Sequence, residues 1–132
     1  MRADTDVEAS FSALGGVFLT PARDIAARLG AIRGLVFDWD GVFNAGSKGE
    51  AASSTFDEAD SMGINLLRYA LWRTRGELPK VGLITGEDNP SARLFAARER
   101  FHAVHSGVRN KAVAVDAFCS ANAVRGEELI CV

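Results

Sequence analysis

The sequence has few of the features that mark several common classes of protein. It contains no uninterrupted run of about 18 apolar residues, so no membrane-spanning helix is expected. The formal net charge is only −2, which gives no reason to expect a nucleic acid or an anionic membrane as partner. The first ten residues lack a basic start followed by an apolar core, which argues against a secretory signal. These absences favour a cytoplasmic protein.

Cysteine and histidine are equally scarce, with two of each in 132 residues. Two cysteines, Cys119 and Cys131, fit a reducing compartment, and their apolar neighbours predict that both are core thiols. His102 and His105 flank a short apolar pair, with no further metal ligands at a suitable spacing. Structural or surface roles are therefore predicted for both histidines.

The chain has enough hydrophobic residues to form the core of one domain. Hydrophobic residues make up 48% and charged residues 24% of the sequence, as in an ordinary soluble domain. A flexible arm is predicted at residues 1–19, followed by one domain at residues 20–132. Helices are expected at 20–32, 60–74, 89–101 and 110–122, strands at 34–40, 78–86, 103–107 and 127–132, and a β-hairpin flap at 41–57.

Strands that alternate with helices predict an α/β fold with a mainly parallel sheet, a Rossmann-like three-layer sandwich. Ligands of such sheets bind beyond the carboxyl ends of the strands. The polar residues at these ends form a coherent set, which comprises Asp38, Asp40, Thr85, Gly86, Ser106, Gly107, Asn110 and Lys111. Two carboxylates, a hydroxyl, an amide and an ammonium could together bind and attack a phosphate.

The chemistry follows from the residue types. A carboxylate such as Asp38 can attack phosphorus, and Asp40 can transfer a proton to the leaving alcohol. Two close carboxylates repel a phosphate dianion unless a cation such as Mg²⁺ neutralises them. Thr85 can donate a hydrogen bond to a phosphoryl oxygen, and Lys111 can balance its charge. Each of these residues alone could equally end a strand, form a turn or face solvent. The prediction of a catalytic site therefore depends on their order along the chain.

Three segments resemble the motifs of the haloacid dehalogenase superfamily of phosphohydrolases. "LVFDWDGVFN" is similar to the first motif, "VGLITG" to the second and "GVRNKAVAVDAF" to the third. "TFDEADSMGINLL" supplies a phenylalanine, an aspartate and a glycine–isoleucine pair that resemble the capless branch containing 3-deoxy-D-manno-octulosonate 8-phosphate phosphatase. The resemblance covers roughly residues 20–132.

This resemblance implies specific roles. Asp38 would be the nucleophile, Asp40 the acid and base, Thr85 with Gly86 the phosphate-binding pair, and Lys111 the charge clamp. Mg²⁺ would be held by the Asp38 carboxylate and the Asp40 carbonyl. The resemblance also implies a homotetramer built through the flaps, no cap domain, and a phosphorylated eight- or nine-carbon sugar acid as substrate.

The sequence departs from that pattern in two places. It stops at Val132, where a fourth, acidic motif would begin, so we expect a chain truncated before that motif. Glu87 follows the threonine–glycine pair where many relatives have arginine, and it would repel a substrate carboxylate. Two alternatives therefore stay open, a non-catalytic oligomerisation module like those fused to acylneuraminate cytidylyltransferases and a phospho-aspartate receiver. The receiver is disfavoured because it would have no use for Asp40 as a proton-transfer group.

Overall fold

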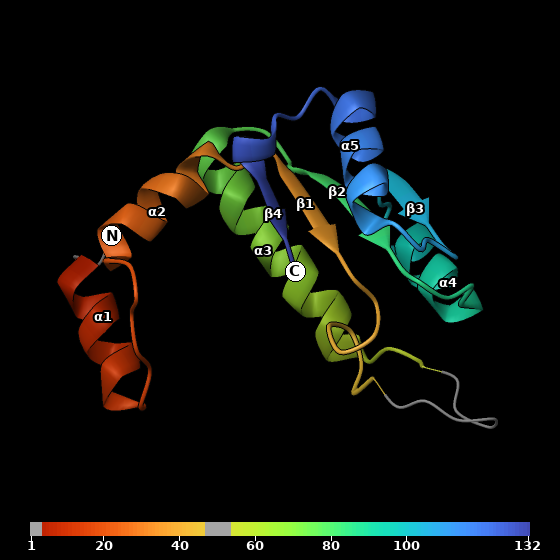
Figure 1. Ribbon diagram of the computed structural model, residues 1–132. Helices are drawn as coiled ribbons and strands as arrows, with labels where there is room; N and C mark the ends of the chain where they lie inside the picture. The colour runs from red at the N-terminus through yellow and green to blue at the C-terminus, as the bar shows by residue number, and fades with distance from the viewer. Residues whose placement is uncertain (1–3, 47–53) are drawn as a thin grey trace. The chain divides into compact units, whose positions relative to one another are not determined.

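The computed structural model describes residues 4–46 and 54–132, which fall into two compact units that meet between Ala31 and Ile32 (Figure 1). The helices are α1 (Asp4–Ala13), α2 (Ala22–Ala31), α3 (Glu58–Arg75), α4 (Pro90–Arg98) and α5 (Lys111–Asn122), with a 3₁₀ turn at Gly126–Glu128. The strands are β1 (Gly34–Phe37), β2 (Lys80–Ile84), β3 (Ala103–His105) and β4 (Leu129–Cys131). None of the described helices is both long and apolar enough to cross a membrane.

The first unit differs from the arm that the sequence predicted. Residues 4–13 form α1, which packs against α2, and the rings of Phe11 and Phe18 meet edge to face at 6.0 Å. The Glu8 carboxylate also accepts a hydrogen bond from the backbone N–H of Ala22, at the start of α2. The sequence did not predict this helix because contacts between the two helices, rather than a strong apolar periodicity, hold α1 together.

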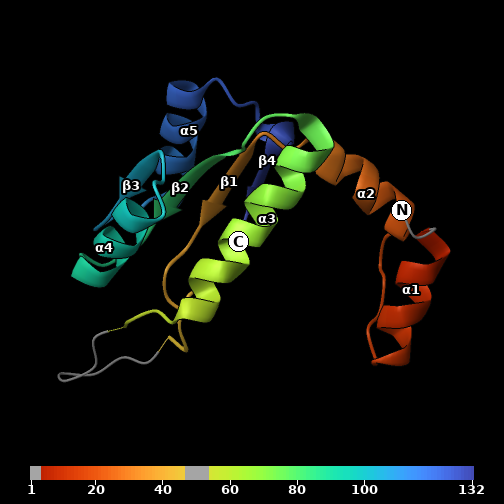
Figure 2. The ribbon, with the colours of Figure 1, turned by 180° about the vertical axis from the view of Figure 1, so that it is seen from behind.

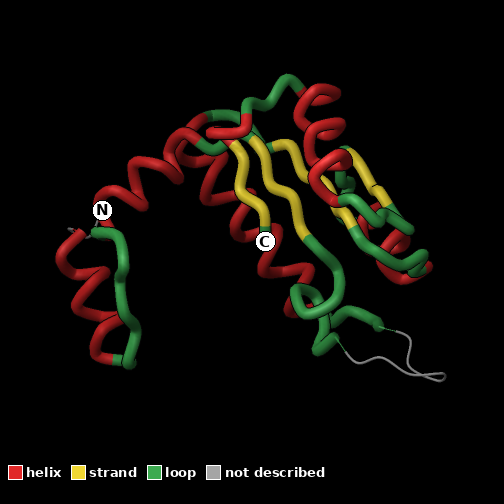
Figure 3. The backbone as a smooth tube through the Cα atoms, in the orientation of Figure 1, coloured by secondary structure: helices red, strands yellow, loops and turns green. Residues whose placement is uncertain are grey.

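The second unit, residues 32–132, has the α/β architecture that the sequence predicted. Its described strands are all parallel and lie in the order β3-β2-β1-β4, so their carboxyl ends share one edge of the sheet (Figure 1). The tube view shows these strands side by side (Figure 3). The register pairs Phe37 of β1 with Leu83 of β2 and Val36 with Cys131 of β4. The predicted strands and helices of this unit are all present, with slightly shorter strands. The predicted hairpin lies largely in residues 47–53, outside the described residues, and its described flanks at 41–46 and 54–57 contain no strand.

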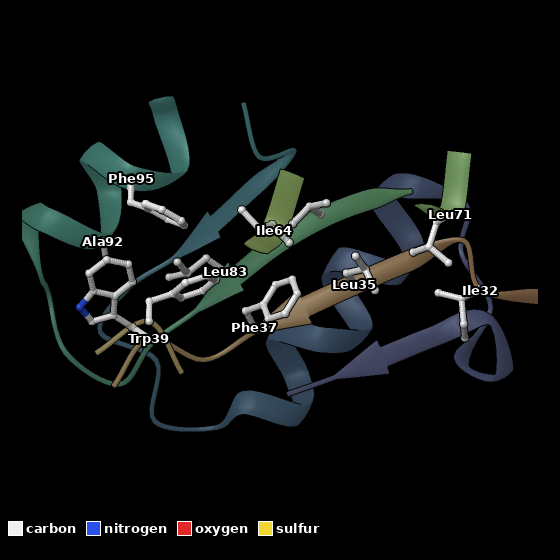
Figure 4. Close-up of a cluster of buried hydrophobic side chains, with 11 residues drawn as sticks. Ile32, Leu35, Phe37, Trp39, Ile64, Leu71, Leu83, Ala92 and Phe95 are labelled. Carbon is white, nitrogen blue, oxygen red and sulfur yellow. The ribbon is translucent and has the colours of Figure 1, made fainter. Parts of the chain in front are cut away.

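Each face of the sheet has its own core, as alternation along β1 requires. Leu35 and Phe37 face α3 and α4, where they meet Ile64, Leu71 and Phe95 (Figure 4). Val36 faces the opposite side and packs with Ile84, Ala114 and Phe118, the last two from α5. The result is a three-layer sandwich with α3 and α4 on one face and α5 on the other, and both views of the ribbon show this arrangement (Figure 2).

Two glycines let α5 lie close to the sheet. A Cβ atom at Gly82 would come within 2.8 Å of the Phe118 ring, and one at Gly34 would come within 2.8 Å of Leu129 and 3.0 Å of Val124. Both distances are shorter than ordinary van der Waals contact allows, so only glycine fits these two positions without displacing its neighbours. These contacts hold the second half of α5 against the sheet.

Candidate functional site

Asp38 lies directly after β1, at the shared edge of the sheet. Its backbone N–H donates to the carbonyl of Val132 at 2.9 Å, which continues the pairing of β1 with β4. Its Oδ1 atom accepts a hydrogen bond from the Trp39 N–H at 2.8 Å. The hydrogen bond from Trp39 holds the carboxylate in place. About a third of the side chain is exposed, so a ligand can still reach it.

Lys111 meets Asp38 across 73 residues of sequence. Its Nζ atom lies 2.5 Å from Asp38 Oδ2 and is half exposed. A charge-assisted hydrogen bond of this length holds the carboxylate in one orientation. Lys111 is the first residue of α5 and follows the N-cap Asn110, so the helix start carries the ammonium to the site. The structure thus brings together Asp38, from the first motif-like segment, and Lys111, from the third.

Thr85 is placed by hydrogen bonds on both sides. Its N–H donates to the carbonyl of His105 at 2.8 Å, and its carbonyl accepts from the N–H of Val108 at 3.0 Å. These bonds tie the end of β2 to the loop that leads into α5. The Thr85 side chain is only 1% exposed, whereas Gly86 next to it is exposed. The backbone of Gly86 is therefore accessible to a ligand at this strand end, whereas the side chain of Thr85 is buried.

Asp40 stands at the start of a tight turn and is half-buried. Gly41 follows with a φ of +82°, a left-handed conformation that favours glycine. This turn carries the chain away from the strand end and leaves room beside Asp38. The sequence predicted a strand through Asp40, whereas β1 ends at Phe37 and Asp40 lies in the turn that follows.

Asn44 organises this turn, although the sequence prediction gave it no role. Its Oδ1 accepts from the N–H groups of Gly46 at 2.8 Å and Gly41 at 3.4 Å, and its Nδ2 donates to the carbonyl of Trp39 at 3.2 Å. Asparagine side chains commonly close turns by bonding to nearby backbone. The signal that could have identified it is an asparagine between two glycines immediately after a strand.

Trp39, between the two aspartates, anchors the segment in the core. The residue is fully buried and its ring lies 5.6 Å from Phe43 and 5.7 Å from Phe95 (Figure 4). Phe56, one of the residues of the capless-branch resemblance, packs on Phe95 at 4.8 Å. Asp60, another of them, accepts a hydrogen bond from the N–H of Asp57 at 2.8 Å and so caps α3. The aromatic cluster fixes the backbone from which Asp38 projects toward Lys111 of α5.

Both histidines are accounted for without a metal. The Nδ1 atom of His102 accepts the N–H of Val81 at 3.1 Å. Burial, followed by the charges of Lys80 and Arg68, lowers the pKa of His102. His105 lies in β3, whose backbone pairs with β2. Within residues 4–46 and 54–132, no three Asp, Glu, His or Cys side chains gather as a metal site.

The core prediction for the cysteines needs correction. Cys119 is only partly buried and Cys131 is exposed. Cys131 lines a cavity of about 260 Å³ together with Asp38, Lys111 and Val115. β4 is an edge strand among the described strands, so one side of Cys131 has no neighbouring strand to cover it.

No family model and no curated protein sequence matches this chain. Solved structures do match. A hypothetical protein from Xanthomonas campestris is 28% identical, with a TM-score of 0.66, over 82% of this chain and 57% of that one. The cobalt-bound deoxy-D-mannose-octulosonate 8-phosphate phosphatase of Haemophilus influenzae is 24% identical, with a TM-score of 0.65, over 79% of this chain and 59% of that one.

A third match is the 3-deoxy-D-manno-octulosonate 8-phosphate phosphatase of Moraxella catarrhalis, solved with magnesium, phosphate and a KDO molecule. It is 16% identical, with a TM-score of 0.68, over 83% of this chain and 61% of that one. The chain therefore has the fold of haloacid dehalogenase phosphatases of this branch, as its motifs predicted. It spans about three fifths of the length of the structures it matches.

Proposed function

We propose that this chain is a Mg²⁺-dependent phosphomonoester hydrolase that works through an aspartyl-phosphate on Asp38. The observation that carries this proposal is the contact between Lys111 and Asp38 at the shared edge of the parallel sheet. A lysine here holds the carboxylate in place and offsets the negative charge of an incoming phosphoryl group. The phosphatase fold of the matched structures supports the same reaction class.

In the proposed reaction, Asp38 Oδ attacks phosphorus and the bond to the leaving oxygen breaks. The Trp39 N–H, already bonded to Oδ1, holds the carboxylate so that one oxygen faces the substrate. Asp40 gives a proton to the leaving alcohol and then takes one from the water that hydrolyses the aspartyl-phosphate. Thr85 and Gly86, at the end of the neighbouring strand, bind phosphoryl oxygens.

The oxygen donors present fit Mg²⁺, which proteins bind through one or two carboxylates with water and substrate phosphate completing the shell. Asp38 and Asp40 would hold the ion. When bound, it would neutralise the phosphate and the two carboxylates. Because Asp38 and Asp40 are the two residues proposed to hold the ion, we expect weak binding of Mg²⁺ without substrate, with a dissociation constant of about 1 mM.

The proposed substrate is a phosphorylated eight- or nine-carbon sugar acid, such as 3-deoxy-D-manno-octulosonate 8-phosphate. Its support is the KDO molecule in the matched Moraxella structure. Glu87 is exposed next to Gly86, and its carboxylate would weaken binding of the substrate acid. We therefore expect a higher KM for sugar-acid phosphates than for neutral sugar phosphates of the same size, and a Glu87→Gln variant should narrow that difference.

The test is phosphate release from a panel of sugar phosphates in the presence of Mg²⁺. Replacement Asp38→Asn removes the nucleophile with little change in shape and should lower kcat by a factor on the order of 10³ or more. Asp116→Asn, an exposed acid on α5, is the matched control and should keep wild-type activity. An Asp38→Asn variant with full activity would rule out the aspartyl-phosphate.

A second function is a non-catalytic assembly module. The observation that favours it is that no group of three Asp, Glu, His or Cys side chains gathers as a metal site among residues 4–46 and 54–132. We propose that the chain is a homotetramer in either case, which light scattering of the purified protein tests. A tetramer that releases no phosphate from any substrate and binds no Mg²⁺ would select the assembly module, and Mg²⁺-dependent turnover would exclude it.

A further inference from the structure

Helix α5 and strand β4 each carry one cysteine, and both thiols face the layer between them. Cys119 packs against the core cluster of Val36, Ile84 and Phe118 on the α5 side of the sheet. Leu129, the first residue of β4, packs against the same cluster, whereas Ile130 packs against the cluster on the opposite face. Side chains alternate along a strand, so Cys131 returns to the α5 side.

The surroundings of the two thiols overlap. Cys131 lines its cavity with Val115 of α5 and with Val36, its partner in the strand register. Val115 precedes Cys119 by four residues, so the two lie one above the other on the same face of α5. Val36 belongs to the cluster against which Cys119 packs. Both sulfurs therefore border the same small region between helix and sheet.

The electrostatics and the packing agree with this placement. Burial raises the pKa of both thiols, and the charge of Cys119 adds to the rise at Cys131. Phe118, next to Cys119, sits over Gly82 with no room for a Cβ atom between them. This end of α5 is therefore held close against the sheet.

We propose that Cys119 and Cys131 form a modification site at which a peroxide oxidises the two thiols to an intramolecular disulfide that ties α5 to β4. Cys131 is the more exposed thiol, so its thiolate attacks hydrogen peroxide, breaks the O–O bond and becomes a sulfenic acid. Cys119 then attacks that sulfur, and water leaves as the S–S bond forms. In sum, two thiols lose two electrons and two protons, and one peroxide becomes two waters.

The two elements that would be joined also hold the proposed catalytic residues. Val132, next to Cys131, accepts the hydrogen bond from the N–H of Asp38, and Lys111 begins α5. A disulfide would fix β4 relative to α5 and thereby change the spacing of Asp38 and Lys111. An effect on phosphate release rests on the proposed function, whereas formation of the bond does not.

The experiment is oxidation of the native protein with hydrogen peroxide, followed by trypsin under non-reducing conditions and mass spectrometry. Arg125 lies between the two cysteines, so trypsin separates residues 112–125 from residues 126–132. The expected product, in the monomer-sized fraction after denaturing electrophoresis, is these two peptides joined, lighter by two hydrogens than their sum. Both free thiols should disappear together and return with dithiothreitol.

Two control variants, Cys119→Ser and Cys131→Ser, should yield no joined pair under the same conditions. In Cys119→Ser the expected product is the sulfenic acid at Cys131, trapped with dimedone. Joined peptides found only between two molecules, or in wild type a sulfenic or sulfinic acid at Cys131 with Cys119 unreacted, would overturn the proposal. Neither outcome depends on catalysis, so a protein without phosphatase activity still gives a decisive result.

Discussion

At the scale of single residues, the absence of a side chain matters as much as the presence of a charge. Gly82 lies under the Phe118 ring, where a Cβ atom would approach to 2.8 Å. Phe118 is buried, so its ring has little room to yield. We expect Gly82→Ala to destabilise the fold by about 1–3 kcal/mol through overpacking, measured as a lower denaturation midpoint in urea.

Gly63 is the matched control for this substitution. It lies within α3, is exposed, and has open space where a Cβ atom would be. Gly63→Ala should therefore stabilise the protein by roughly 0.5–1 kcal/mol, because alanine is the better helix former. Equal effects of the two substitutions, in either direction, would contradict the view that α5 needs Gly82 for its close approach.

The same scale shows what local sequence could and could not indicate about the site. Asp38, Thr85 and Lys111 could be singled out from the sequence because Asp38 and Thr85 directly follow apolar strands and Lys111 begins a helix. Asn44 was missed because its role depends on three backbone contacts within one turn. The burial of Thr85 and the exposure of Cys131 depend on which strands are neighbours in the sheet, and a strand's own residues do not encode this.

At the scale of elements, apolar pattern and capping residues predicted the α/β unit well. Asn89 caps α4 as expected, since its side chain accepts hydrogen bonds from Ser91 and Ala92. The failure was α1, where the composition is polar and small and no apolar stripe marks a helix. That helix depends on contacts with α2, and tertiary contacts of this kind override weak local preferences.

His102 gives an element-scale prediction about pH. It joins β2 to the segment entering β3, because its N–H donates to Val81 and its Nδ1 accepts from Val81. Protonation would remove that acceptor and leave the buried Val81 N–H unpaired. Burial, with Lys80 and Arg68, lowers the pKa of His102, so the folded state binds fewer protons than the unfolded state. The stability that neutral His102 contributes is present above the pKa of histidine in the unfolded state, about 6.5. It is lost as the pH falls below that value.

Urea unfolding at several pH values between 5 and 8 measures this effect. His102→Asn keeps an acceptor for the Val81 N–H but cannot titrate, so its stability should fall less between pH 7.5 and pH 5.5 than that of wild type. If wild type and variant lose stability in parallel over this range, His102 is not the responsible group.

At the scale of the whole molecule, the candidate site exists only because distant segments meet. Asp38 and Lys111 are 73 residues apart, and their contact depends on β2, β3 and the α5 packing between them. The sequence predicted that both would reach the same sheet edge, because parallel strands end together. Their direct ion pair is a result of the register and of the close approach of α5, which only the folded chain defines.

Magnesium binding should therefore stabilise the whole fold. A ligand that binds only the folded state raises stability by RT ln(1 + [L]/Kd), about 1.4 kcal/mol for 10 mM Mg²⁺ and a Kd near 1 mM. For a domain of this size the midpoint of thermal unfolding should rise by roughly 3–6 °C.

NaCl at equal ionic strength is the control for screening of charges by salt and should give a smaller rise in the midpoint. Asp38→Asn removes the proposed carboxylate ligand and leaves the Asp40 carbonyl, so it should abolish most of the Mg²⁺ effect. A shift of the same size in that variant would place the ion elsewhere, whereas no shift in wild type would favour the assembly module over the hydrolase.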